Sequence, residues 1–341
     1  MIKSIPVQEA VGKLLCHDIT SIVPGEFKGR AFKKGHVIQE QDISALLKMG
    51  KEHIFVMELD PGDIHEDDAA IRIARAAAGT GIVLSETCEG RVNLMAGGCG
   101  LLKVNKKALF RINSIEEIVF ASLHSHRVVT DKCPVAGTRI VPLVTREEKV
   151  MAVESICHEE YPVVEIKPFR SLQVGIVTTG SEIFHGRISD KFGPVLREKF
   201  AELGSAVMDQ VMVSDDVAMT VGAIQSFIDR GAGLIAVTGG MSVDPDDQTP
   251  AAIRATGARV VSYGAPAFPG AMFMLAYLGD VPIIGLPGCV MYFKASIFDL
   301  IIPRILVGET IQREDIIALG YGGFCESCPS CHYPCCGFGK G

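Results

Sequence analysis

The sequence predicts an α/β protein whose main domain has a mostly parallel sheet with helices on both faces. From Leu172 onward, short apolar runs alternate with amphipathic segments of helical length. This alternation is typical of strand–helix units in a parallel sheet. Several of the apolar runs end in a loop rich in glycine, hydroxyl or acidic residues. The residues before Leu172 lack the regular alternation, so we expect mixed α/β structure there.

The elements of the main domain follow from the spacing of their apolar residues. Short β-branched and apolar runs predict buried strands, and stretches with helical periodicity predict the helices between them. The predicted strands span residues 174–178, 206–213, 234–237, 259–263 and 281–285. The predicted helices span residues 194–203, 217–229, 250–256 and 291–306, the last as one long helix.

The N-terminal half is predicted to be less regular. We expect a short helix at 42–49, a strand at 53–57 and an alanine-rich helix at 65–78, whose first turn is acidic as a helix dipole favours. Residues 81–165 predict only short strands and turns, including strands at 139–144 and 162–166. These patterns divide the chain into a β-rich unit (1–62), a mixed middle domain (63–168), the main domain (169–311) and a cysteine-rich tail (312–341).

The composition excludes some classes of partner. A net charge of −7 gives no general attraction to nucleic acid or to anionic membranes. The longest apolar stretch, residues 271–286, is interrupted by Asp280 and Pro282 and is too short to span a bilayer. The first residues lack the apolar core of a signal peptide, and eleven cysteines without such a signal indicate a reducing compartment. We therefore expect a cytoplasmic protein.

The strongest functional signal lies in residues 236–250. A buried strand ends in Thr238-Gly239-Gly240, an acidic loop follows, and Thr249-Pro250 opens a helix as its cap and first residue. Glycines let backbone N–H groups approach an anion, and a helix start adds partial positive charge. Three aspartates beside such a cradle favour Mg²⁺ as the link to the anion. They are Asp244, Asp246 and Asp247. The segment predicts a phosphate-bearing ligand held with a metal.

Three further polar loops follow predicted strands, at 178–194, 214–216 and 285–289. Each also has a structural explanation, as a turn with a helix cap, as helix capping, or as a Pro-Gly turn. Because the carboxyl ends of parallel strands meet at one edge, the four loops together predict a single phosphate-binding crevice. The chain has no Gly-x-x-x-x-Gly-Lys-Ser/Thr motif, and no Gly-x-Gly-x-x-Gly follows the domain's first strand. The candidate binding residues are Thr178, Thr179, Gly180, Ser181, Glu182, Asp190, Gly193, Thr238, Gly239, Gly240, Met241, Ser242, Thr249, Pro287, Gly288 and Cys289.

The order of these motifs resembles the molybdopterin-binding domain shared by the MogA and MoeA families. The similar residues are Thr238-Gly-Gly with Asp247-x-Thr-Pro250, Thr179 to Glu182, Asp190 to Pro194 and Leu286 to Gly288, within about residues 172–308. The resemblance implies a MogA-like fold. It also implies molybdopterin or its adenylylated form as the ligand. MogA-type proteins adenylylate molybdopterin with Mg-ATP, and MoeA-type proteins insert molybdenum from molybdate into the adenylylated pterin.

The same resemblance implies roles for individual residues. Asp247 and Asp215 would hold Mg²⁺ and act as catalytic residues, with Asp246 assisting. We expect a molybdotransferase or adenylyltransferase-like enzyme, which couples Mg²⁺-dependent adenylyl transfer or hydrolysis to molybdenum insertion. Its small-molecule partners would be the pterin and a nucleotide. The alternative is a non-catalytic carrier or maturation factor for one client molybdoenzyme. The related families form dimers or trimers, so the resemblance also implies a homo-oligomer.

Some positions depart from the family pattern and indicate a divergent branch. MoeA proteins usually have Asp where this chain has Ser181, and Asn-Pro where it has Cys289-Val290. A thiol in this loop is a candidate ligand for the dithiolene or the molybdenum. Residues 32–56 look like a segment that MoeA proteins place directly before this domain. The basic residues between 30 and 36 form either a solvated surface loop or an arm that reaches the pterin phosphate or molybdate.

The tail carries a second candidate site. Five of the eleven cysteines lie in the last 17 residues, which indicates a bound metal because crowded exposed thiols oxidise readily. The spacing of Cys325, Cys328, Cys331 and Cys335 resembles a four-iron ferredoxin run, and these are the predicted metal ligands. His332 and Cys336 are alternatives that would complete a compact zinc site. A reactive or sulfur-carrying tail is the third interpretation.

Overall fold

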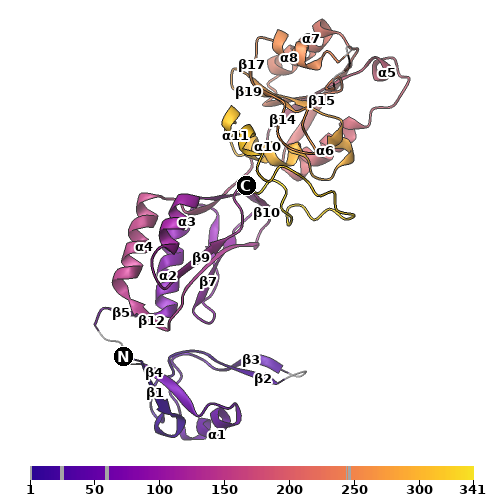
Figure 1. Ribbon diagram of the computed structural model, residues 1–341. Coiled ribbons are helices and arrows are strands. Elements are labelled where there is room, and N and C mark those ends of the chain that lie inside the picture. Colours follow the sequence, from indigo (N-terminus) through magenta and orange to yellow (C-terminus); the bar gives the residue numbers. More distant parts are fainter. Residues whose placement is uncertain (1, 24–26, 58–60, 243, 245–246) are drawn as a thin grey trace. The chain divides into compact units, whose positions relative to one another are not determined.

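The computed structural model describes residues 2–23, 27–57, 61–242, 244 and 247–341 (Figure 1). The chain forms two compact units. The first contains Met1–Gly98, Leu102–Leu123 and Thr130–Ile166, and the second contains Cys99–Leu101, His124–Val129 and Lys167–Gly341.

The second unit is built on a six-stranded sheet in the order β15-β14-β16-β19-β18-β17. Within this sheet the chain starts at β14, adds β15 on one side of it and then crosses to β16 on the other side. These three strands and β19 are parallel. The strands are β14 (Gln173–Thr179), β15 (Ala206–Val213), β16 (Leu234–Thr238), β17 (Arg259–Tyr263), β18 (Met274–Leu278) and β19 (Val281–Leu286).

Helices cover both faces of this sheet, as the sequence predicts (Figure 1). Successive strand residues point to opposite faces. Val174 and Ile176 therefore pack on one side with α6 (Phe192–Glu202), α10 (Ile297–Leu306) and α11 (Arg313–Ala318). Val177 faces the other side, where α7 (Val217–Asp229) and α8 (Thr249–Ala255) complete a second core. Because the central strands are buried on both faces, they read as continuous apolar runs in the sequence.

At the end of this domain the sequence analysis missed one strand, β18, and predicted one helix wrongly. The apolar stretch 271–286 contains two strands, because Gly279, with φ of +58°, and Asp280 form a two-residue turn between paired Leu278 and Val281. This hairpin pairs β18 antiparallel with β19, and β17 in turn pairs antiparallel with β18. The predicted long helix 291–306 is divided into α9 (Cys289–Tyr292) and α10. Phe293 is extended, and the Ser296 hydroxyl accepts a hydrogen bond from the Phe298 N–H, which starts the new helix.

The middle part of the first unit has an antiparallel sheet, β6-β7-β11-β9, with α2 packed on β7 and β11 and α4 beside α2. The elements along this part of the chain are β5 (Asp63–His65), α2 (Glu66–Ala77), β6 (Ile82–Leu84), β7 (Arg91–Ala96), β8 (Gly100–Val104), α3 (Lys106–Asn113), β9 (Ile118–Ser122), β10 (Val128–Val129), β11 (Pro134–Ile140), β12 (Val144–Arg146), α4 (Glu147–Glu159) and β13 (Val164–Lys167).

The prediction of only strands and turns between residues 81 and 165 is therefore wrong. It missed α3, which the Asn105 side chain caps by accepting from the Ala108 N–H at 3.0 Å, and α4. The predicted strand at 139–144 is divided between β11 and β12, because Pro142 lies between them and lacks the N–H that a strand ladder needs.

The N-terminal part contains β1 (Ile2–Pro6), a 3₁₀ turn (Val7–Glu9), β2 (Ile19–Val23), β3 (Phe27–Phe32), α1 (Glu40–Lys48) and β4 (His53–Met57). Strands β1 and β4 pair antiparallel, as do β2 and β3. The basic stretch is held by acidic partners: Arg30 lies 2.9 Å from Asp18, and Lys34 lies 2.9 Å from Asp67. These ion pairs favour the surface-loop interpretation of this stretch over a free arm.

The C-terminal residues belong to the second unit instead of extending as a loose tail. We call residues 319–341, after α11, the C-terminal lobe. Phe338 is buried in the core beneath α10, and the Tyr333 hydroxyl donates to the Asp299 carbonyl at 3.0 Å. The backbone of Phe324 forms an isolated parallel β-bridge with that of Phe268. Within the described ranges, no helix has the length and apolar character needed to cross a membrane.

The cap of α10 gives a test of the fold. Replacing the fully buried Ser296 with alanine should lower the free energy of unfolding by about 1 kcal/mol, because the Phe298 N–H loses its side-chain acceptor. Urea unfolding measures this change. Ser226→Ala on the exposed face of α7 is the control and should change it by less than about 0.5 kcal/mol. Equal stability of the two variants would contradict the assigned cap.

Candidate functional site

The four polar loops lie at the carboxyl edge of the parallel strands. They follow β14, β15, β16 and β19, and the strand order reverses between β14 and β16. Such a reversal is where ligands bind in open α/β sheets, because the connections on either side diverge and leave a crevice. The loops after β14 and β16 therefore flank the favoured position for a ligand.

Two glycines fix the contact between these central loops. Gly239 and Gly240 have φ of +83° and +53°, a conformation that side chains rarely adopt. A Cβ atom on Gly239 would lie 2.1 Å from the Thr179 carbonyl oxygen, and one on Gly240 would lie 2.9 Å from the Thr249 hydroxyl oxygen. Only glycine allows the loop after β16 to pack this closely on the end of β14.

A chain of threonine hydroxyls supports the same contact. The Thr249 hydroxyl donates to the Gly239 carbonyl at 2.9 Å and lies 3.1 Å from the Thr179 hydroxyl. Thr249 is the first residue of α8, so its predicted role as a helix cap is wrong. Its side chain instead bonds back to the loop. Thr178 and Thr238 are likewise buried and bonded to each other at 3.3 Å. These threonines hold the strand ends together.

The loop after β14 contains the short helix α5 (Ser181–Phe184) and is shaped by Asp190. The Asp190 carboxylate accepts from the Phe192 and Gly193 N–H groups, each at 2.9 Å, at the start of α6. Gln210 in β15 donates to the same carboxylate at 2.6 Å and to the Thr178 hydroxyl at 2.9 Å. Sequence reasoning missed Gln210, because a single polar residue within a strand gives no signal of the partners it will meet.

Asp215 joins the loops after β14 and β15. Its carboxylate accepts from the Ser181 N–H at 2.8 Å. The neighbouring Asp216 caps α7 by accepting from the Met219 N–H at 2.7 Å. An open hollow of about 620 Å³ lies here, lined by Asp215, Asp216 and Gln248 with apolar residues of α7 and α8.

Asp247 organises the acidic loop. Its carboxylate accepts from the Ser242 N–H at 2.7 Å and the Asp244 N–H at 3.3 Å, and its own N–H donates to the Asp244 carbonyl at 3.0 Å. Asp246, the predicted assisting residue, lies outside the described residues. In the described part of the chain, no three His, Cys, Asp or Glu side chains are grouped to hold a metal ion. The structure thus gives Asp215 and Asp247 positions in the loops without joining them in one ligand set.

The loop after β19 combines open and buried residues. Pro287 is buried, whereas Gly288 is exposed and a Cβ atom there would meet nothing within 4 Å. Burial raises the pKa of the half-buried Cys289 thiol. Since metals bind the thiolate form, this shift opposes the expected ligation by Cys289 at neutral pH.

The remaining candidates divide between core and surface. Met241 is 5% exposed and packs against Gly285 in the core beneath α7 and α8, so it does not offer its sulfur to a ligand. Glu182 and Ser242 are exposed, Ser181 is half-buried, and Gly180 has φ of +143°. Accessible groups of the edge therefore include Gly180 to Glu182, Gly239, Gly240, Ser242 and Gly288.

The sheet topology and the glycine-built edge define an α/β domain of the class that binds small anionic ligands at a switch point. Residues 175–306 match the family described as "Probable molybdopterin binding domain", and residues 4–58 match a domain of unknown function (DUF8806). The main domain therefore belongs to the molybdopterin-binding domain family.

Curated relatives match only part of their length. A CinA-like protein of Mycolicibacterium gilvum is 34% identical over 79 residues, which are 23% of this chain and 19% of the relative. A molybdenum cofactor biosynthesis bifunctional protein of Synechococcus elongatus is 30% identical over 83 residues, 24% of this chain and 26% of the relative. The chain thus spans about a fifth to a quarter of these relatives.

Solved structures of similar proteins include MoaB from Thermus thermophilus, with 21% identity and a TM-score of 0.33, covering 40% of this chain and 98% of that one. Another is the tungsten cofactor synthesizing protein MoaB from Pyrococcus furiosus, with 22% identity and a TM-score of 0.31, covering 35% and 84%. Because these TM-scores are low, the assignment of the fold rests on the topology of the six-stranded sheet.

The packing of Gly239 can be tested against a matched glycine. Gly257 has nearly the same φ, +80°, but a Cβ atom there would meet nothing within 4 Å. Gly257→Ala should cost about 1 kcal/mol of unfolding free energy, for its backbone conformation alone. Gly239→Ala should cost about 1–3 kcal/mol more, because its methyl group meets the Thr179 carbonyl. Denaturant unfolding measures both, and equal losses would show that the loop is not packed as described.

Proposed function

We propose that the protein acts in molybdenum cofactor biosynthesis and binds molybdopterin or its adenylylated form at the carboxyl edge of the main sheet. The observation that carries the proposal is the glycine contact between the loops after β14 and β16 at the switch point, in a domain of the molybdopterin-binding family. The similarity to a molybdenum cofactor biosynthesis protein of Synechococcus elongatus supports the proposed role in cofactor biosynthesis.

The accessible edge offers groups suited to phosphate. Gly180, Gly239 and Gly240 lack side chains at the ends of β14 and β16, and Ser181 and Ser242 carry hydroxyls. Gly288 leaves open space after β19. Hydroxyl donors bind phosphate oxygens, and a glycine lets the ligand approach the backbone closely. Buried Thr178 and Thr238 would then support the edge instead of touching the ligand.

We further propose that Asp215 and Asp247, with Asp246, hold Mg²⁺ against the ligand's phosphates. Protein sites for Mg²⁺ commonly supply only one or two carboxylates, and substrate phosphates and water complete the shell. The absence of a three-residue ligand group among the described residues is therefore compatible with this role. When bound, Mg²⁺ would neutralise charge on the pyrophosphate that is formed or broken. The reaction would be adenylyl transfer or hydrolysis coupled to molybdenum insertion from molybdate.

Ligand binding is tested by adding a negative charge at the open edge. Gly288→Glu should lower the pterin content by at least about tenfold, because the carboxylate would repel the phosphate while its backbone conformation, with φ of −52°, suits any residue. The measurement is the fluorescence of oxidised pterin in protein purified anaerobically from a host that makes the cofactor. Ser226→Glu is the control, because it adds the same charge near the C-terminal end of α7. No pterin in the wild type, under conditions where a known binder retains it, would overturn the proposal.

Turnover is tested by removing single carboxylate charges. Asp215→Asn and Asp247→Asn should each lower Mg²⁺-dependent adenylyl transfer or hydrolysis by about 100-fold while pterin is retained. Asp216→Asn is the matched control, because Asn caps a helix as well as Asp does and the neighbouring charge is lost in the same way. Unchanged turnover in the Asp215 and Asp247 variants would exclude their catalytic roles.

A second candidate is a non-catalytic carrier or maturation factor for one client molybdoenzyme. The bonding of Asp215 and Asp247 favours it, since each carboxylate already accepts a hydrogen bond from loop backbone. Pterin retained without any ATP- or Mg²⁺-dependent reaction would support this function. The expected homo-oligomer is part of either proposal and is tested by light scattering of the purified protein.

A further inference from the structure

The C-terminal lobe is a folded part of the second unit, and it encloses its own cavity. The Cys325 N–H donates to the Phe268 carbonyl at 2.8 Å, and the Gly339 N–H donates to the Gly322 carbonyl at 2.8 Å. With Phe338 buried, both ends of the cysteine-rich segment are fixed. The intervening cysteines are therefore held near one another by the fold and not only by their sequence spacing.

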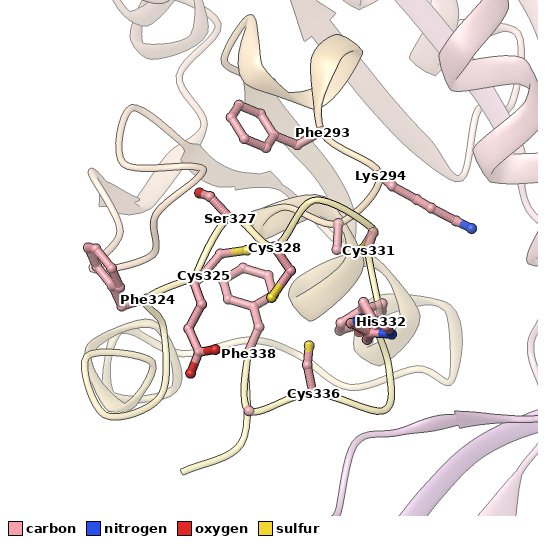
Figure 2. A pocket seen from close by; sticks show the side chains of 14 residues that line it. Phe293, Lys294, Phe324, Cys325, Ser327, Cys328, Cys331, His332, Cys336 and Phe338 are labelled. Carbon is pink, nitrogen blue, oxygen red and sulfur yellow. The ribbon is translucent and has the colours of Figure 1, made fainter.

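Four of the five cysteines surround the cavity, which measures about 180 Å³. Figure 2 shows Cys325, Cys328, Cys331 and Cys336 around this hollow, which Phe293, Phe324 and Phe338 also line. His332 belongs to the same lining. All of these cysteines are free thiols. Soft sulfur ligands in a largely apolar wall are typical of sites for thiophilic metals.

The fifth cysteine is directed elsewhere. Cys335 is not part of the cavity lining, and the Arg127 guanidinium donates to its sulfur at 3.2 Å. The Cys335 N–H donates to the His332 carbonyl at 2.6 Å, which closes a turn just before Cys336. Because neighbouring residues of this turn send their side chains in different directions, Cys336 reaches the cavity and Cys335 does not. The structure thus opposes the ligand set that the spacing predicts.

The arrangement of the thiols distinguishes between metal centres. A structural zinc ion needs four ligands converging on one point, with sulfur at about 2.3 Å from the metal. Among the described residues, no three His, Cys, Asp or Glu side chains are placed to hold a single metal ion. The thiols instead surround a space of about 180 Å³. An iron–sulfur cluster fills such a space with its own iron and sulfide and binds thiolates that are separated from one another.

We propose that Cys325, Cys328, Cys331 and Cys336 bind an iron–sulfur cluster in this cavity, and that Cys335 is not a ligand. The buried Phe338 side chain would shield the inner side of the cluster from water. The inference concerns a site separate from the carboxyl-edge loops, so it does not depend on the proposed pterin function.

The test uses the full-length protein purified without oxygen and incubated with ferrous iron and sulfide. Wild type should bind iron and acid-labile sulfide in equal amounts, with broad visible absorption. Cys336→Ser should lose most of both, whereas the adjacent Cys335→Ser should keep them. Circular dichroism of the cluster-free variants verifies that each is folded. The iron and sulfide content of the wild type alone shows whether a cluster forms.

Three results would overturn the proposal. One zinc per chain, with neither iron nor sulfide bound, would exclude a cluster. Loss in Cys335→Ser with retention in Cys336→Ser would restore the ligand set predicted by spacing. Full retention in both would show that the fourth ligand is wrongly assigned. Pterin content measured on the same samples reports on the proposed function separately, so a failure of one proposal is distinguishable from a failure of the other.

Discussion

The architecture of the main domain depends on the close approach of the chain after β16 to the end of β14. A Cβ atom at Gly239 would lie 2.1 Å from the Thr179 carbonyl oxygen, so the contact is possible only because this residue is glycine. The contact lies where the strand order reverses, between the neighbouring strands β14 and β16. Buried threonine hydroxyls join the same strand ends and satisfy one another where water is excluded. The loops that follow β15 and β19 take their positions around this centre.

The aspartates of the edge accept hydrogen bonds from backbone N–H groups within the protein. Asp190 bonds the start of α6, Asp215 connects two loops, and Asp247 closes the acidic loop on itself. A carboxylate that accepts N–H groups fixes a loop in one conformation and still brings negative charge to the edge. This double use explains how an acidic loop can lie beside the proposed phosphate-binding crevice. It also means that replacing such a residue tests chemistry only when the fold is measured alongside.

The sequence predicted the parallel core well, because strands buried on both faces and amphipathic helices leave strong periodic signals. The bounds of β15, α7 and β17 agree with the predicted ranges. It failed where short-range geometry decides the structure. The turn at Gly279 and Asp280 divided one apolar run into two strands, and the Ser296 cap divided one helix into two. The helix α3, of only eight residues, was missed because a short helix carries too few apolar repeats to be recognised.

The sequence by itself determined the α/β class, the four loops and their molybdopterin-binding resemblance, because motif order and hydrophobic period are properties of the chain. Only the tertiary structure decided which candidates are buried and which are accessible at the edge of the sheet. It buried Thr178, Thr238 and Met241, and it found Gln210 as the partner of Asp190. In the C-terminal lobe it placed Cys336 at the cavity and Cys335 beside Arg127. Spacing along a chain cannot make that distinction, because adjacent side chains point in directions that depend on how the folded backbone turns.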